Sequence, residues 1–395
     1  MGTDPWHRYL QCLLAGSLLA GAAFHVQSAS GQSDQTIAAP GNPAAAMEQY
    51  RRALDAYNAA HDRYTAVADA YWSSISAKRK SRNAKRAAGE ALSIDDYVLD
   101  QPPVYTGPPK PRNPLKPETP EHRAAVPVVA DFVAAAQQQF NFVPRMPQSD
   151  IEFKRVYAQV AQAAGLTKDQ VVRIYSFEAT GNGSYDVEAG LEYNKHARAI
   201  TTALGYNQLL ATNSVEIVAE KGPQFIEEFH AEARGLADGQ RQALENKIEV
   251  LRKMVAFARS VSDDWNQHEI LANTEKGLGV HALNLDIDVG PLLQTQKLLD
   301  SVVFARRKGV TRTLTAAELE MMNLTGDGNG FDMVTMPPEW RAQVPTSNFF
   351  RPSGYFDNPV AQHNNVVAKL IAATDARMDE ETKKQGAKDL AAVLH

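Results

Sequence analysis

Residues 171–214 read VVRIYSFEATGNGSYDVEAGLEYNKHARAITTALGYNQLLATNS, and this stretch carries the strongest structural signals of the chain. Its first apolar side chains recur at the spacing of an α-helix: Val171, Val172, Ile174, Tyr175 and Phe177. Thr167 is a typical N-cap, with Gln170 at the third helical position. The breaker at 180–183 (TGNG) follows. We therefore expect a helix that ends at Glu178.

A carboxyl group at the end of such a helix has unusual surroundings. The C-terminus is the negative end of the helix dipole, and the aromatic neighbours of Glu178 exclude water. Both effects favour the protonated form, which is the form that donates a proton to a glycosidic oxygen. The alternative interpretation is an exposed glutamate at a frayed helix end.

A turn sequence follows downstream, with Gly205, Tyr206, Asn207 and Gln208 in succession. This segment resembles the Gly-Leu-Met-Gln turn of soluble lytic transglycosylases and related lysozyme-like domains, and the resemblance covers about residues 150–225. Gly205 and Gln208 match the glycine and glutamine of that motif, whereas Tyr206 and Asn207 replace Leu and Met. Glu178 with its following alanine corresponds to the family's Glu-Ser pair.

The resemblance implies a lysozyme-like fold and cleavage of the β-1,4 bond between the amino sugars of peptidoglycan. Glu178 would protonate the leaving oxygen and then act as a base, which gives an anhydro product. Tyr206 and Gln208 would bind substrate on the matched turn, and Asn213 would supply a hydrogen bond. The open alternative is a non-catalytic envelope protein with this fold that binds peptidoglycan or scaffolds partners.

A hydrolase would need a second carboxylate at about 5–9.5 Å from the first. Asp186, Glu188 and Glu192 are the nearby candidates in the sequence, and each is equally interpreted as a polar loop residue. Glu178 and Gln208 are 30 positions apart, so residues 183–200 would form an inserted hairpin or loop. The sequence leaves the choice between transglycosylase and hydrolase open.

The first residues predict export. Arg8 precedes an apolar stretch, and small residues follow at 28–30, so we interpret 1–30 as a signal peptide and 31–46 as a flexible tether. An uncleaved anchor is the alternative; otherwise no stable membrane span is expected. The only cysteine, Cys12, lies inside this signal, which excludes disulfides from the remaining chain. We expect a periplasmic or secreted bacterial protein.

Residues 47–98 predict an amphipathic helical segment. Its tyrosines recur every seven residues at Tyr50, Tyr57, Tyr64 and Tyr71. The part at 47–75 would pack on the main body or on an envelope protein partner. A basic cluster at 78–86 is interpreted as a solvated face or as a contact with anionic lipid or wall polymer. Residues 99–120 are proline-rich and predict a stiff linker or a surface strap.

The rest of the chain predicts a mainly α protein. Helical spacing recurs in 121–360, the expected lysozyme-like helical domain, and residues 361–395 are interpreted as a C-terminal helical tail. A short hairpin is expected near 181–194. The helical segments expected in the body lie near 121–140, 150–164, 167–178, 195–212, 214–221, 223–235, 238–261, 291–308 and 315–323.

The formal net charge of −5 does not favour nucleic-acid binding. We expect neither cofactor nor metal. The stretch 327–332 (DGNGFD) resembles part of a calcium loop, but a tight turn explains it more simply. Peptidoglycan or a related amino-sugar polymer is the expected partner.

Overall fold

The computed structural model describes residues 43–116, 126–179, 201–356 and 358–395. These residues form helices and no regular strand, so the mainly α prediction is confirmed for the described part of the chain. The helices are α2 (Pro43–Ala88), α3 (Val129–Phe140), α4 (Asp150–Ala163), α5 (Lys168–Glu178), α6 (Ala211–Ala233), α7 (Asp238–Ala258), α8 (Trp265–Ala272), α9 (Glu275–His281), α10 (Gly290–Arg307), α11 (Ala316–Thr325), α12 (Asp327–Thr335), α13 (Pro338–Arg341), α14 (Pro352–Phe356), α15 (Pro359–His363), α16 (Val367–Glu381) and α17 (Gln385–Val393). Short 3-10 turns lie at η1 (Ile94–Asp96), η2 (Ala282–Leu285) and η3 (Thr346–Phe349). None of the described helices combines the length and the apolar composition that crossing a bilayer requires.

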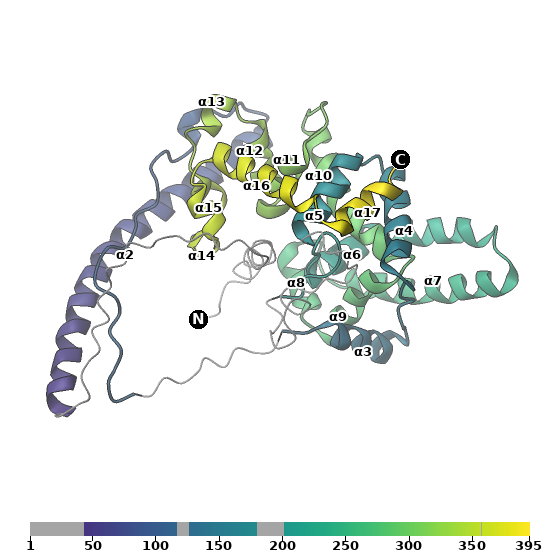
Figure 1. Cartoon of the computed structure of the whole chain (residues 1–395), viewed down its shortest axis with the longest axis horizontal. Coiled ribbons are helices and arrows are strands. Elements are labelled where there is room, and N and C mark those ends of the chain that lie inside the picture. Colours follow the sequence, from purple (N-terminus) through teal and green to yellow (C-terminus); the bar gives the residue numbers. More distant parts are fainter. Residues whose placement is uncertain (1–42, 117–125, 180–200, 357) are drawn as a thin grey trace.

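Helix α2 projects from the body as an arm, and the proline-rich segment returns along it (Figure 1). The ring of Tyr105 in that segment packs edge-on against Tyr57 and Tyr64 and also contacts His61. The tyrosine stripe of the helix therefore covers a strap of the same chain, as one of the two sequence interpretations of 99–120 expected. The helix begins at Pro43, inside the range expected for the tether.

Part of the basic cluster anchors this arm to the body: Arg82 is not on a solvated or lipid-facing surface, whereas Lys80 is exposed. Arg82 is fully buried and bonds to Asp332 and to the backbone oxygens of Asp96 and Asn348. Arg86 donates to the same Asp332 carboxylate at 3.0 Å. Because buried charges need partners, this side of α2 is held by specific contacts.

Two apolar clusters form the core. The first joins α4, α5, α11 and α12 with the end of α2 and the C-terminal helices. The second joins α3, α6, α7 and α9 with the start of α10. Helices α16 and α17 pack against α5 and α4, so the expected tail 361–395 is part of the first cluster.

The structure corrects three expectations about local structure. Residues 201–210, expected to be helical within 195–212, form a turn closed by a bridge between Leu204 and Leu209. Helix α6 runs through Pro223 without ending, although separate segments were expected on either side of it. The calcium-like stretch at 327–332 begins α12, and Asp332 accepts from Arg82 rather than bounding a tight turn.

Residues 1–42, which include the expected signal peptide and most of the tether, lie outside the described residues. The same holds for the expected hairpin near 181–194 and for its acidic candidates Asp186, Glu188 and Glu192.

Candidate functional site

Glu178 is the last residue of α5, as the sequence predicted. The capping box at the other end is confirmed: the hydroxyl of Thr167 accepts from the backbone of Gln170, whose side chain accepts in return. Val171, Ile174 and other apolar residues of α5 are fully buried, which fixes the helix against the first core cluster. This packing carries the Glu178 side chain into the interior, where it is only 4% exposed.

Glu178 lies beside a second buried carboxyl group, that of Glu320 on α11. The amide nitrogen of Asn323 donates to Oε1 of Glu178 at 2.7 Å and lies 3.5 Å from each oxygen of Glu320. Burial raises the pKa of Glu178 well above its ordinary value, and the neighbouring Glu320 raises it further. Burial also raises the pKa of Glu320 to about 7. The expectation of a frayed, exposed glutamate is therefore wrong.

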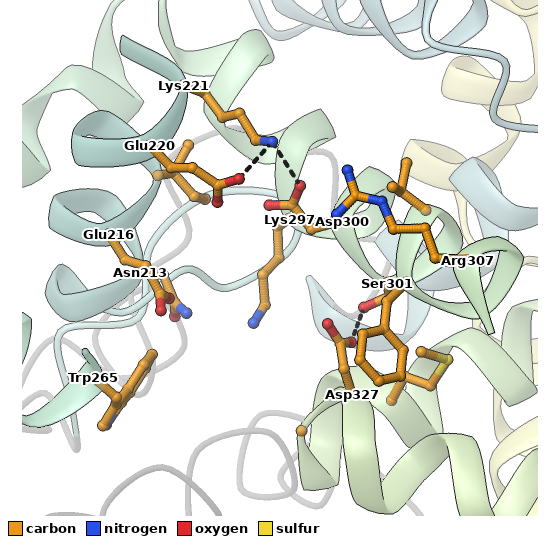
Figure 2. A pocket seen from close by; sticks show the side chains of 15 residues that line it. Asn213, Glu216, Glu220, Lys221, Trp265, Lys297, Asp300, Ser301, Arg307 and Asp327 are labelled. Atoms are coloured by element: carbon orange, nitrogen blue, oxygen red, sulfur yellow. Dashed lines mark hydrogen bonds and ion pairs between the residues drawn. The ribbon is translucent and has the colours of Figure 1, made fainter. Parts of the chain in front are cut away.

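A cavity of about 370 Å³ lies between α6 and α10 (Figure 2). One wall comes from α6 and the start of α8, and the other comes from α10, α11 and the start of α12. The side chain of Lys297 extends into its middle, with Glu216 on one side and Asp327 on the other. The lining includes Asn213, Glu216, Glu220, Lys221, Trp265, Lys297, Asp300, Ser301, Arg307, Met322 and Asp327.

Lys297 connects the cavity with the buried pair. Its positive charge lowers the pKa of Glu178 and of Glu320, and it acts in the same direction on Glu216. Met322 lines the cavity, and its neighbour on α11, Asn323, bonds to Glu178. The pair and the cavity are therefore linked through α11 and through the charge of Lys297.

Among the carboxyl groups that line the cavity, Glu216 has the largest pKa shift. Burial raises its pKa to about 6, and Asp263 and Asp300 add to this effect against Lys297. Lys221 is engaged elsewhere, since it pairs with Glu220 at 2.8 Å and with Asp300 at 3.6 Å. A carboxyl with this pKa exchanges protons near neutral pH, as acid–base catalysis requires.

The structure places Tyr206 in the core and not at the cavity. It is fully buried, and its ring packs against Phe153, Tyr157 and Tyr175. Its hydroxyl donates to Asp150 at 2.8 Å. A ring enclosed on these sides has no face left for a pyranose, so the substrate-binding role predicted for it does not suit this geometry.

Gln208 shapes the turn that precedes α6. It adopts a positive φ of 45°, and its side-chain amide donates to the backbone oxygen of Gly205 at 2.9 Å. Gly205 itself has a φ of 83°, and a Cβ there would collide with the side chain of Gln294. Gln294 in turn accepts from the backbone of Asn207 at 2.8 Å. The Gly-Tyr-Asn-Gln turn is thus anchored to α10.

Asn213 is the one predicted binding residue that lines the cavity. It sits in the first turn of α6, where its side-chain oxygen accepts from the backbone of Leu210 at 3.1 Å. The rigid turn therefore determines where Asn213 meets the cavity (Figure 2). Of the four predicted site residues, Asn213 lines the cavity, Glu178 is buried outside its lining, Gln208 shapes the turn before α6, and Tyr206 lies in the core.

Several residues of the site were missed by sequence reasoning. A signal existed for α6, because Asn213, Glu216 and Glu220 follow each other at the helical spacing that puts them on one face. No local signal identifies Lys297 or Glu320, because both come from helices distant in the sequence. Among the described residues, no group of three or more His, Cys, Asp or Glu side chains is arranged to hold a metal ion.

A second hollow of about 620 Å³ lies between the α6–α7 hairpin and residues 141–145. It is larger, but its basic side chains are paired: Lys247 binds Asp286 and Asp288, and Arg145 binds Asp288. It contains nothing comparable to the Glu178–Glu320 pair or Glu216, so the first cavity is the better candidate site.

No family, no curated protein and no solved structure matches this chain in the comparisons. The functional assignment therefore rests on the site itself.

Proposed function

We propose that this protein is an exported bacterial enzyme with a lysozyme-like domain that cleaves the glycan strands of peptidoglycan, with Glu178 as its acid and base. One observation carries the proposal. Glu178, whose pKa burial raises well above its ordinary value, ends α5, and Lys297, whose charge acts on it, extends into a cavity that holds a second acid, Glu216. Carboxyl groups with raised pKa values near a cleft are typical of enzymes that protonate glycosidic oxygens.

The order of elements supports the lysozyme-like assignment. Helix α5 ends in Glu178, and the Gly205–Gln208 turn then leads into α6, which forms one wall of the cavity. In the resembling family a glutamate likewise ends a helix, and the Gly-x-x-Gln turn with its following helix lines the sugar cleft.

The proposed reaction needs one carboxyl group and no water. The proton of Glu178 passes to the glycosidic oxygen while the bond from that oxygen to C1 breaks. Ionised Glu178 then takes the proton of the C6 hydroxyl of the same muramic residue, and the C6 oxygen bonds to C1. The products are an anhydro end and a free C4 hydroxyl, and Glu178 is protonated again. Lys297 offsets the negative charge that Glu178 carries between the two steps.

The cavity supplies groups that suit a sugar. Trp265 presents an indole at its edge, and aromatic rings with a few fixed polar groups are typical of small-ligand sites (Figure 2). Asn213 and Asp327 lie on opposite walls, where they would bond to hydroxyl or N-acetyl groups.

The decisive experiment is digestion of purified peptidoglycan by residues 31–395, with products identified by mass spectrometry. We expect anhydro-muropeptides from the wild-type chain and none from Glu178→Gln. Glu318→Gln is the matched control, because Glu318 is a buried glutamate on α11, the helix of Glu320, but pairs with Arg312. Reducing ends that depend on Glu216 would instead identify a hydrolase, and a parallel digestion of chitosan tests a related amino-sugar polymer.

A non-catalytic glycan-binding protein is the second candidate. The observation that favours it is the burial of Glu178, whose Oε1 is held by Asn323 and which does not itself line the cavity. Retention of the chain on peptidoglycan, with no product and no effect of Glu178→Gln, would identify this function. The projecting arm formed by α2 and its strap would then be the surface available to an envelope protein partner.

A further inference from the structure

The carboxyl groups of Glu178 and Glu320 can share a hydrogen bond only if one of them is protonated, because ionised carboxylate oxygens are acceptors only. Oε2 of Glu178 is fully buried, and no N–H or hydroxyl of the described residues donates to it. Oε1 already accepts from Asn323, and the same amide nitrogen lies 3.5 Å from both oxygens of Glu320. Two ionised carboxylates side by side in the buried interior repel each other strongly, so the pair binds one proton more readily than either group alone.

The two carboxyl groups do not hold this proton equally. The hydrogen bond between them raises the pKa of Glu178 and lowers that of Glu320. Since Oε2 of Glu178 receives no donor from the described residues, while both oxygens of Glu320 lie near the Asn323 amide, Glu178 is assigned as the donor and Glu320 as the acceptor. The pair is the kind in which two groups titrate together and one of them is kept in its acid form.

We propose that Glu320 is a positioning residue: its carboxylate accepts the hydrogen bond of the Glu178 hydroxyl and so keeps Glu178 loaded as the acid of the reaction. Asn323 holds the other oxygen of Glu178, which fixes the rotation of the carboxyl group. The use of this proton in glycan cleavage rests on the proposed function. The shared proton itself does not depend on catalysis.

The charged groups that face the pair come from two helices. Helix α11 supplies Glu320 itself, and α10 supplies Lys297, which lowers the pKa of both carboxyls. Lys297 also faces Glu216 across the cavity. The ammonium group of Lys297 therefore opposes one negative charge on the pair. If both carboxyl groups were ionised, no second cation among the groups that shift these pKa values would oppose the second charge.

The first test needs no substrate. Glutamate side chains labelled with ¹³C at the carboxyl carbon are titrated by NMR in the full chain, and Glu178→Gln and Glu320→Gln assign the two signals. We expect two coupled carboxyl titrations above the ordinary glutamate range in the wild type. In Glu320→Gln the remaining signal should move down by about one pH unit or more, because the repulsion and the acceptor are both lost. An unchanged Glu178 titration in Glu320→Gln would overturn the proposal.

Asn323→Ala should shift the pKa of Glu178 in the opposite direction to Glu320→Gln. The amide of Asn323 stabilises the charged form of Glu178, so its removal should raise the titration of Glu178. A downward shift, or no shift, would contradict the arrangement even if Glu320→Gln did not fold. Glu318→Gln should leave both signals in place.

The second test uses activity. The basic limb of the pH profile of kcat/KM should move to lower pH by about one unit in Glu320→Gln, and Glu320→Asp should restore part of the shift. A uniform loss of rate without a shift of this limb would show a merely structural role. If the protein cleaves no glycan, the proposed function fails while the NMR titration still decides the inference about the pair.

Discussion

The buried carboxyl pair makes a quantitative prediction about stability, which Glu320→Gln tests. Burial raises the pKa of Glu320 from 4.5 to about 7. A raised pKa means that the folded state binds the proton more tightly than the unfolded state. Its contribution to stability is therefore complete below pH 4.5 and is lost as the pH rises through 7.

The size of this loss follows from the pKa difference. Each unit corresponds to about 1.4 kcal/mol, so Glu320 accounts for about 3 kcal/mol between pH 4.5 and pH 8. Glutamine at this position has nearly the same shape and no charge. The free energy of unfolding of Glu320→Gln should therefore gain about 3 kcal/mol relative to the wild type over this range.

The assay is urea unfolding of both proteins, followed by circular dichroism at pH 4.5, 6, 7 and 8. The NMR titration follows the pKa of Glu178, which Glu320 raises and this substitution changes. The comparison between the two proteins cancels the shared groups whose pKa the substitution leaves unchanged. This matters for His281, whose pKa is lowered to about 4 by burial and whose contribution is lost in the opposite direction, as the pH falls from 6.5. A constant difference between variant and wild type across the series would refute the reasoning.

Three further variants test the remaining structure. Gly205→Ala should destabilise the chain by about 1–3 kcal/mol or more in urea unfolding, because a positive φ and the contact with Gln294 both oppose a Cβ; wild-type stability would contradict the turn. Arg82→Met should cost about 3–5 kcal/mol, since Asp332 loses a buried partner, and should expose the arm to limited proteolysis; an unchanged cleavage pattern would argue against the anchor. Tyr206→Phe should cost about 1 kcal/mol through one lost hydrogen bond and leave any glycan cleavage intact, whereas a large rise in KM would place this residue at the substrate after all.

The sequence predicted the local features of the site better than the contacts between segments that are distant in the chain. The end of α5 at Glu178 and the cap at Thr167 follow from side chains within four residues of each other, and both are confirmed. Glu320 is 142 residues from Glu178, so no local pattern indicates that the two carboxyls meet. Tyr206 shows the same limit, because a tyrosine on a turn has the same sequence signal whether it faces a cleft or a core.

Tertiary contacts also explain the local errors. The stretch 201–210 has helical spacing, but Gly205 and the bonds to Gln294 hold it in a turn. The basic cluster at 78–86 looks solvated in isolation, yet Arg82 is buried against Asp332 and Lys85 pairs with Asp96. Pro223 does not end α6, which packs along its length against α7 and α8.

Whether Glu178 donates a proton to a glycan is read most directly from the mass spectrum of peptidoglycan digested by residues 31–395. We expect anhydro-muropeptides from the wild-type chain and from Glu318→Gln, and none from Glu178→Gln. Equal product from the wild type and Glu178→Gln, or no product from a folded wild-type chain, would contradict this expectation.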